Sequence, residues 1–219
     1  MALPLLYLVG AGVVALASAG YAAYKHYADD EQSDSGVKPN EINLGRFAIW
    51  GHADVGKTTF IEQLREKTIS ADKSQTTARE VIDDIPVKNV NGKKYKIKSI
   101  VDMPGVLDRF DDWLEIAIEY ENISYLVDLS RWENHEDSVR YVISVEADIE
   151  RTVEVLSKLK DKKRRLNIVF THLDKSIWAD VETAQVVNTL HKEKNIRKLY
   201  ELMNNSAVAG YIYAVNLID

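Results

Sequence analysis

The sequence predicts an α/β domain whose six-stranded, mostly parallel sheet carries helices on both faces. Three observations lead to this architecture. From about Ile42 onward, short apolar runs alternate with longer stretches of helical periodicity, an order typical of strands joined by crossover helices. A glycine-rich turn from Gly51 to Thr58 lies between the first apolar run and the first helical stretch. An apolar N-terminal stretch predicts one transmembrane helix before the domain.

Composition places limits on function. With 219 residues, 46% of them hydrophobic, the chain can bury the core of one domain and still carry an appendage. The net charge of −6 argues against a nucleic-acid partner, because surfaces that bind nucleic acid are normally basic. The chain has no cysteine, which excludes disulfides, thiolate metal ligands and a cysteine nucleophile.

Residues 2–24 contain no charged side chain. A helix of this length, rising ~1.5 Å per residue, spans a hydrocarbon core of ~30 Å. We therefore expect residues 1–27 to form a single-pass membrane anchor, and the polar residues 28–41 to form a flexible linker to a domain at residues 42–219. The alternatives are a signal peptide cleaved after Ala17-Ser18-Ala19 and a buried core helix.

Lys25 directly follows the apolar stretch and favours a cytoplasmic domain, because cytoplasmic flanks carry the excess of basic residues. Asp29, Asp30 and Glu31 follow closely, so this charge bias is small. Small side chains recur every four residues at Ala11, Ala15, Ala19 and Ala23. Such a stripe lets two membrane helices approach closely, which would give a homodimer. The alternative is that alanine is simply common in membrane helices.

The first predicted strand, residues 46–50, leads into Gly51-His52-Ala53-Asp54-Val55-Gly56-Lys57-Thr58 and then into a predicted helix at residues 57–66. The segment matches G-x-x-x-x-G-K-[ST], which in this setting predicts a phosphate-binding loop. Backbone N–H groups, the helix dipole and Lys57 would meet the charge of a polyphosphate, and the Thr58 hydroxyl would bind Mg²⁺. His52 either assists catalysis or simply tops the loop.

Strands are predicted next at residues 80–87 and 94–101. The pair Asn91-Gly92 between them is a hairpin signal, so these strands should be antiparallel neighbours. The second strand ends in Asp102-Met103-Pro104-Gly105. An aspartate there can hold Mg²⁺ through water, and a glycine three residues later lets its N–H face a γ-phosphate. An ordinary turn is the alternative.

The remaining strands are predicted at residues 124–128, 167–171 and 211–215, and the remaining helices at residues 110–119, 136–160 and 183–203. The strand at 167–171 closes in Thr171-His172-Leu173-Asp174. The Asp174 carboxylate can accept hydrogen bonds from the N1–H and 2-amino groups of guanine, whereas adenine would leave a buried acid unpaired. Asp174 is therefore predicted to select guanine, with His172 packed beside the base.

With these three motifs in order, the chain from about Leu44 onward resembles the translation-factor-related class of P-loop GTPases, which includes Ras-like, elongation-factor and Era-like proteins. Its phosphate loop is similar to the elongation-factor version. An anchor helix before one small domain resembles the signal-recognition-particle receptor β subunit, and Thr-His-x-Asp resembles the variant of chloroplast import receptors and immune-associated GTPases. The resemblance implies the P-loop NTPase G-domain fold, GTP or GDP with Mg²⁺ as ligands, and a cytoplasmic domain.

Carried over position by position, the resemblance implies catalytic roles for Lys57, Thr76 and Gly105. Thr76, chosen over Thr77, is the switch I threonine that would bind magnesium together with Thr58 and Asp102. The nucleotide contacts that the resemblance implies are Gly51, Asp54, Val55, Gly56, Lys57, Thr58, Thr59, Thr171, His172, Asp174, Ala214 and Val215.

The sequence departs from the family pattern in three places. Val106 and Leu107 follow Gly105 where Ras-like enzymes carry a water-orienting glutamine, so hydrolysis should be slow. Thr171 and His172 replace asparagine and lysine. The sequence ends straight after the sixth predicted strand, where the family has a final helix; either that helix has been removed or something else covers that sheet face. We expect a membrane-anchored GTP/GDP switch with an unknown protein effector. The alternatives are a GTP-bound scaffold or receptor subunit with negligible hydrolysis and a P-loop ATPase or kinase.

Overall fold

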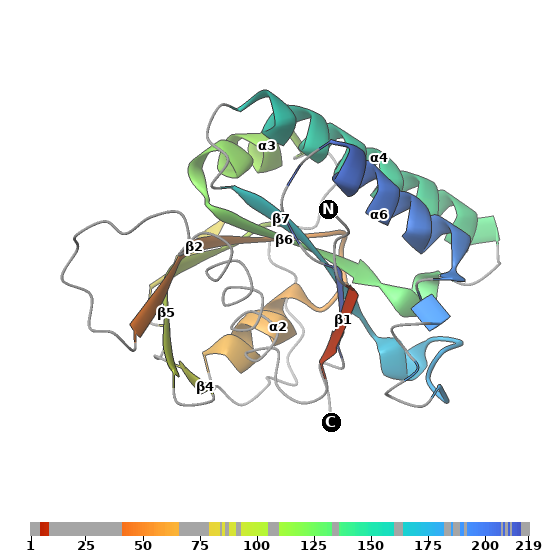
Figure 1. The fold of residues 1–219 in the computed structure, drawn as a ribbon, viewed down its shortest axis with the longest axis horizontal. Helices are drawn as coiled ribbons and strands as arrows, with labels where there is room; N and C mark the ends of the chain where they lie inside the picture. Colours follow the sequence, from red (N-terminus) through yellow and green to blue (C-terminus); the bar gives the residue numbers. More distant parts are fainter. Residues whose placement is uncertain are drawn as a thin grey trace.

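The computed structural model describes residues 5–8, 41–65, 79–83, 85, 88–90, 93–104, 110–132, 136–159, 164–181, 185, 189–190, 192–206, 208, 210 and 212–215. Within these ranges, eight strands form one sheet in the order β1-β8-β7-β6-β2-β5-β3, and β4 pairs with β5 outside that path. Figure 1 shows this sheet crossing the molecule with helices above and below it.

Five parallel strands form the centre of the described sheet. They are β8 (Ile212–Val215), β7 (Arg165–Thr171), β6 (Asn122–Asp128), β2 (Glu41–Trp50) and β5 (Lys93–Asp102). All of β6 and nearly all of β7 are buried, as expected for parallel strands that helices cover on both sides. The predicted α/β fold with a mostly parallel sheet is confirmed.

The predicted count of six strands is wrong. The segment expected as one strand at residues 80–87 contributes two short strands, β3 (Glu80–Ile82) and β4 (Lys88–Val90), both antiparallel to β5. Between them the sequence carries Pro86, which has no N–H to donate to a sheet ladder. The hairpin prediction is confirmed, since Val90 pairs with Lys93 across a two-residue connection.

The second additional strand, β1 (Leu5–Leu8), pairs in parallel with β8 at the edge of the sheet. The expected anchor helix is wrong for these four residues, because an extended segment here satisfies the open backbone groups of the β8 edge. In the part of the chain that the structure describes, no helix is long and apolar enough to span a bilayer. The rest of the expected anchor and nearly all of the linker lie outside the described residues.

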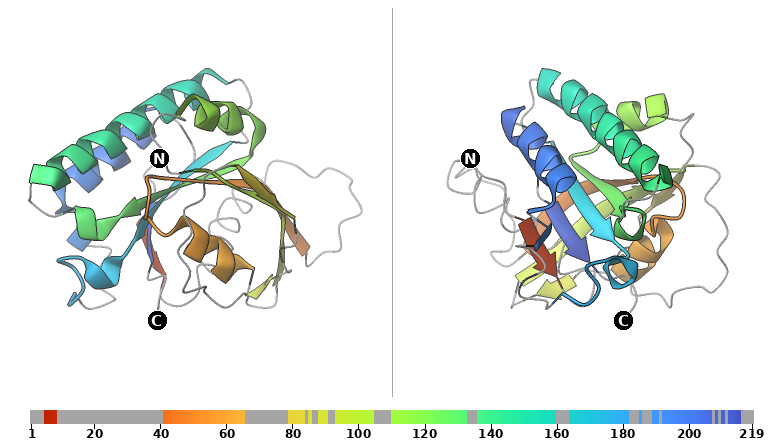
Figure 2. Two further views of the ribbon diagram at one scale, coloured as in Figure 1. Left: turned by 180° about the vertical axis from the view of Figure 1, so that it is seen from behind. Right: turned by 90° about the vertical axis from the view of Figure 1, so that its right-hand side faces the viewer.

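Helices cover both faces of the sheet, as predicted. One face carries α2 (Lys57–Leu64), and the other carries α3 (Phe110–Glu119), α4 (Glu136–Lys158) and α6 (Lys194–Asn205) (Figures 1 and 2). The helix expected at residues 183–203 does not run through Glu193, whose backbone is extended and whose carboxylate accepts the Ile196 N–H at 2.7 Å. This cap starts α6 at Lys194.

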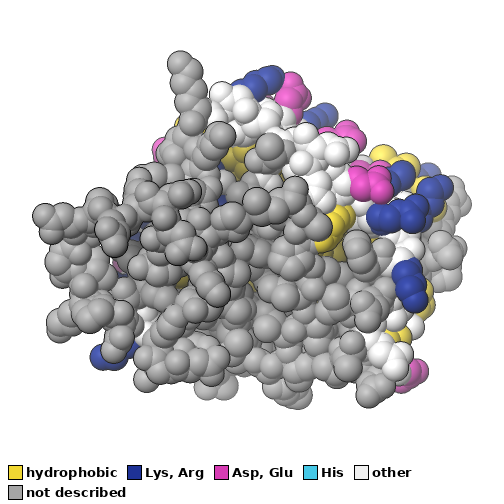
Figure 3. All heavy atoms as spheres, viewed as in Figure 1, with side chains coloured by type: hydrophobic (Ala, Val, Ile, Leu, Met, Phe, Trp, Pro, Cys, Tyr) yellow, Lys and Arg dark blue, Asp and Glu magenta, His cyan; other side chains and the backbone are white. Residues whose placement is uncertain are grey.

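A hydrophobic cluster of described residues lies between the sheet and the layer of α3, α4 and α6. The side chains of Trp50, Trp113, Tyr125 and Phe170 are fully buried in it. On the outer side, α4 and α6 present acidic, basic and apolar side chains together (Figure 3). An ion pair between Lys198 Nζ and Glu146 Oε1 at 3.7 Å joins α6 to α4.

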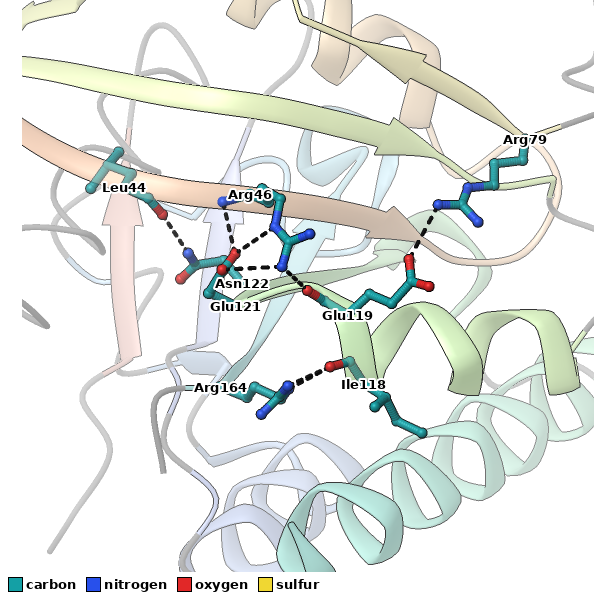
Figure 4. Close-up of polar contacts among 8 residues, drawn as sticks. All are labelled: Leu44, Arg46, Arg79, Ile118, Glu119, Glu121, Asn122 and Arg164. Carbon is teal, nitrogen blue, oxygen red and sulfur yellow. Dashed lines mark hydrogen bonds and ion pairs between the residues drawn. The ribbon is translucent and has the colours of Figure 1, made fainter. Parts of the chain in front are cut away.

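Polar contacts fix the end of α3 near the start of β6 (Figure 4). The Arg46 guanidinium donates to the Glu119 carbonyl and to the Glu121 carboxylate, and Arg164 Nε donates to the Ile118 carbonyl at 2.9 Å. Cations are favoured at a helix C-terminus by the helix dipole. Burial tends to raise the pKa of Glu121, but the hydrogen bonds and charge of Arg46 outweigh it and lower that pKa.

Candidate functional site

The carboxyl ends of the five central strands meet at one edge of the sheet, where open α/β sheets bind their ligands. β2 ends there at Trp50 and continues into the glycine-rich loop and α2. Asp102 closes β5 and lies in register with Ile49. Thr171 closes β7, and Ala214 lies beside Phe170 near the end of β8. Predicted site residues far apart in the sequence therefore share this edge.

The loop between β2 and α2 depends on backbone conformations that few residues adopt. Gly51 has a φ of 133°, and a Cβ atom at that position would lie 2.5 Å from the Leu126 carbonyl oxygen. Asp54 and Gly56 also have positive φ, at 63° and 86°. Gly56 is the N-cap of α2 and makes no side-chain cap. The first backbone N–H groups of α2 are therefore not used by a capping side chain, as an anion-binding helix end requires.

Lys57, the first residue of α2, is buried, and its ammonium group closes the loop. Lys57 Nζ donates to the Gly51 carbonyl at 3.0 Å and to the His52 carbonyl at 2.7 Å. Burial lowers the pKa of Lys57 to about 8, although the charges of Asp102 and Asp54 favour the protonated form. The loop thus holds a desolvated cation that a phosphate group would stabilise.

Two oxygen donors beside the loop suit Mg²⁺. The Thr58 side chain is exposed, and the Asp102 side chain is buried at the end of β5 and interacts electrostatically with Lys57. Among the described residues, no group of three or more His, Cys, Asp or Glu side chains could hold a metal ion. Mg²⁺ typically binds through one or two protein ligands with water and substrate phosphates, so the pair fits that ion.

The predicted base-binding motif lies against the phosphate loop. The Thr171 hydroxyl donates to the Val55 carbonyl at 2.9 Å, and the Val127 carbonyl lies 3.2 Å away as a second acceptor. His172 adopts a left-handed conformation with φ of 53°, and its Nδ1 lies 3.5 Å from Asp128 Oδ1. Asp174 lies on a short helix, η3 (Leu173–Lys175), with its side chain exposed.

Some of the remaining predicted site residues belong to the described part of the chain, and others do not. Thr59 continues the first turn of α2, Ala214 is buried, and Val215 is the last residue of β8. Thr76 and Gly105 lie outside the described residues. The structure therefore brings the phosphate-loop, magnesium and base-motif residues together and describes neither proposed switch residue.

Sequence reasoning missed the buried contacts of His52. Its Nε2 lies 3.2 Å from Asp148 Oδ2 and 3.3 Å from Ser144 Oγ, both on α4, and the Tyr125 hydroxyl donates to the same Asp148 oxygen at 2.7 Å. The signal was polar residues at helical spacing: Tyr141, Ser144 and Asp148 lie at i, i+3 and i+7 on one face of α4. The His52 imidazole therefore packs against α4 instead of only covering the phosphate loop.

Comparison with known proteins adds one finding. The sequence pattern of a family described as 50S ribosome-binding GTPase matches residues 46–172, which is more than half of the chain. The matched segment begins in β2, contains the whole phosphate loop and Asp102, and ends at His172. No curated protein matches the chain.

Proposed function

The chain belongs to the 50S ribosome-binding GTPase family, and on this premise we propose that it is a GTP/GDP switch that binds nucleotide with Mg²⁺ and hydrolyses GTP slowly. The observation that carries the proposal is the hydrogen bond from Thr171 to Val55. It joins the motif that would read the base to the loop that would hold the phosphates. A guanine nucleotide is the ligand that needs both groups at one edge of the sheet.

Different residues would bind the phosphates and the base of the nucleotide. The Lys57 ammonium would exchange its carbonyl partners for β- and γ-phosphate oxygens, and the first N–H groups of α2 would donate to the phosphates. Thr58 and Asp102 would hold Mg²⁺, which neutralises charge on the phosphates when bound. At the other end, Asp174 would accept hydrogen bonds from the N1–H and 2-amino groups of guanine, with His172 beside the ring.

The proposed reaction is attack of water on the γ-phosphorus, which breaks its bond to the bridging oxygen and releases GDP and phosphate. Thr76 and Gly105 are proposed to sense the γ-phosphate. Val106 and Leu107, which follow Gly105, have no polar group to orient the attacking water, and this supports slow turnover. The same feature favours a second candidate, a scaffold or receptor subunit that keeps GTP bound.

Titration of the full chain with fluorescent GTP and ATP in the presence of Mg²⁺ tests the proposal. We expect GTP to bind at least about 100-fold more tightly, because ATP would leave the Asp174 carboxylate without donors. Asp174→Ala should abolish this preference. The matched control is Asp180→Ala, since Asp180 is an exposed aspartate shortly after the motif. Equal affinities for the two nucleotides would contradict guanine recognition.

A single-turnover measurement separates the two candidates. Protein preloaded with GTP is mixed with Mg²⁺, and phosphate release is followed without any partner protein. Slow release that goes to completion supports the switch. GTP that stays intact over many hours while still bound supports the scaffold.

We further propose that residues 2–24 attach the protein to a membrane as a single-pass anchor, with the domain in the cytoplasm near an unidentified protein effector. The uncharged composition of this segment supports the proposal. A spanning helix needs about 20 residues, and residues 9–24 alone number 16. Insertion would therefore require Leu5–Leu8 to leave the edge of β8. Pairing of two such helices through the alanine stripe would give a homodimer.

A further inference from the structure

We propose that Asp148 and His52 are positioning residues that hold the phosphate loop in the shape that binds nucleotide. The inference rests on the proposed function, because it assigns a role in GTP and GDP binding to residues outside the loop's glycine and lysine positions. Asp148 lies 96 positions after His52, on α4.

The side chain of His52 is bound on several sides within the α4 layer. His52 Nε2 contacts Asp148 Oδ2 at 3.2 Å and Ser144 Oγ at 3.3 Å. The imidazole also packs edge-on against the Tyr141 ring, with 5.3 Å between the ring centroids. Only 7% of His52 and 6% of Asp148 is exposed, so water does not compete strongly for these contacts.

The direction of the hydrogen bonds follows from the chemistry of the groups. Burial, and then the nearby charge of Asp148, raise the pKa of Tyr125 well above its usual range, so its hydroxyl keeps a proton and donates to Asp148. An ionised carboxylate only accepts hydrogen bonds. The Nε2–H tautomer of His52 fits this site, because Nε2 lies 3.2 Å from the same Asp148 oxygen.

The backbone of His52 connects this buried cluster to the phosphate subsite. The His52 carbonyl accepts the hydrogen bond from Lys57 Nζ at 2.7 Å. One residue thus contacts α4 through its side chain and the phosphate-binding lysine through its main chain. The main chain of His52 can rotate about φ and ψ, its only soft torsions. Without the side-chain contacts to α4, the His52 carbonyl and the neighbouring N–H groups are therefore free to change direction.

The same face of α4 supports the base motif as well. The Tyr141 hydroxyl accepts the Asp128 N–H at 2.8 Å, and Asp128 Oδ1 lies 3.5 Å from His172 Nδ1. α4 therefore contacts the loop through Asp148 and is connected to the base motif through Tyr141 and Asp128. A change in the position of this helix would act on both ends of the nucleotide.

The test uses the full chain and the variant Asp148→Asn, which keeps the side-chain shape and removes the charge that two donors share. Its matched control is Glu150→Gln, which removes one charge from the exposed side of the same helix. GDP dissociation is measured with a fluorescent analogue, and amide NMR shifts of residues 51–57 are compared in the nucleotide-free proteins. Thermal unfolding of each variant reports whether it folds.

We expect Asp148→Asn to speed GDP dissociation about tenfold and to shift the loop amides, with neither effect in Glu150→Gln. His52→Gln should behave like Asp148→Asn, and the double variant should release GDP no faster than the faster single variant, because both act through one contact. His52→Gln carries the test if Asp148→Asn fails to fold.

Two outcomes overturn the inference: unchanged loop amides in folded Asp148→Asn, or additive effects in the double variant. A wild-type protein that binds no guanine nucleotide would refute the proposed function instead. In that case the loop amides still decide whether Asp148 positions the loop, since that measurement needs no nucleotide.

Discussion

The Thr171 hydroxyl donates a 2.9 Å hydrogen bond to the Val55 carbonyl, across 116 positions of sequence. Thr171 is fully buried at the end of β7, and Val55 is fully buried within the phosphate loop. The bond therefore fixes the distance between the two motifs without any ligand. It also satisfies a carbonyl that the unusual conformation of the loop withholds from regular secondary structure.

Removal of this hydroxyl should destabilise the protein. Thr171→Val keeps the shape of the side chain but leaves the buried Val55 carbonyl without this donor, which costs about 1–3 kcal/mol. We expect a loss of that size in the free energy of unfolding, measured by urea denaturation, and weaker GDP binding. Thr171→Ser keeps the hydroxyl and is the control. A loss from Thr171→Ser as large as that from Thr171→Val would show that packing, and not the hydrogen bond, is responsible.

The depressed pKa of Lys57 predicts a pH dependence of nucleotide binding. In the free protein Lys57 loses its proton near pH 8, and bound phosphates raise its pKa because they favour the ammonium form. Binding above pH 8 therefore takes up a proton, and GDP affinity should fall by up to about tenfold per pH unit. Below pH 8 the affinity should stay nearly constant.

Calorimetric titration between pH 7 and 9, in buffers with different ionisation enthalpies, measures the proton uptake directly. Lys57→Met should bind GDP weakly and with no uptake over this range. Uptake that persists in Lys57→Met would assign the proton to another group.

Much of the fold follows from local patterns in the sequence. Residues 122–128 and 165–171 are rich in apolar and β-branched side chains, and Asp111 and Asp112 favour the start of α3. The exposed edges depend instead on partners distant in sequence. Leu5–Leu8 become a strand only because β8 offers an open edge, and no pattern within four apolar residues distinguishes that strand from part of a membrane helix.

In the candidate site as well, some residues follow from local sequence patterns and others depend on contacts between distant segments. The fixed spacing of a phosphate loop identifies Gly51, Gly56 and Lys57 from the sequence. The contact between His52 and Asp148 is not predictable in this way, since sequence periodicity places Asp148 on the buried face of α4 but does not tell which loop lies opposite. The sequence also predicts Thr171 in the base motif, but its bond to Val55 depends on how β7 and the loop pack together.

Gly51 should tolerate no side chain. In Gly51→Ala the new Cβ would lie 2.5 Å from the Leu126 carbonyl and 2.9 Å from Val55 Cγ2, at a φ of 133°. Such backbone strain costs about 1–3 kcal/mol before any steric clash, so we expect a marked fall in the unfolding midpoint. The comparison is Gly45→Ala, where φ is 75° and the nearest atom is the Glu121 side-chain oxygen at 3.4 Å. Gly45→Ala should lower the free energy of unfolding by about 1–2 kcal/mol. Equal losses of stability in the two variants would contradict the steric argument.

Asp174→Asn should convert guanine preference into xanthine preference. The asparagine amide would donate to the 2-oxo group of xanthine, whereas in a guanine complex it would face the 2-amino group with a second donor. Competition binding should show xanthosine diphosphate displacing fluorescent GDP at least about 100-fold better from the variant than from the wild type. Asp180→Asn should leave the ranking unchanged. An unaltered ranking in Asp174→Asn would remove Asp174 from the base site.

The pairing of β1 with β8 and membrane insertion of residues 2–24 should exclude each other. Leu6 lies in register with Tyr213, and neighbouring positions on paired strands suit the Cα separation of a disulfide. Because the chain has no cysteine, the pair Leu6→Cys and Tyr213→Cys should crosslink cleanly on oxidation. The off-register pair Leu6→Cys and Ala214→Cys should not, because adjacent residues on a strand face opposite sides of the sheet.

Liposome flotation of the crosslinked protein then tests whether the same residues are needed in the bilayer. Reduced protein should float with the vesicles, and the disulfide should abolish flotation, because the 16 residues at 9–24 fall short of the roughly 20 that span a bilayer. Addition of a reductant should restore it. If the crosslinked protein still floats, attachment does not require Leu5–Leu8. If neither cysteine pair crosslinks in vesicle-free solution, the edge pairing itself is refuted, and an anchor helix through residues 2–24 has no competing partner in the domain.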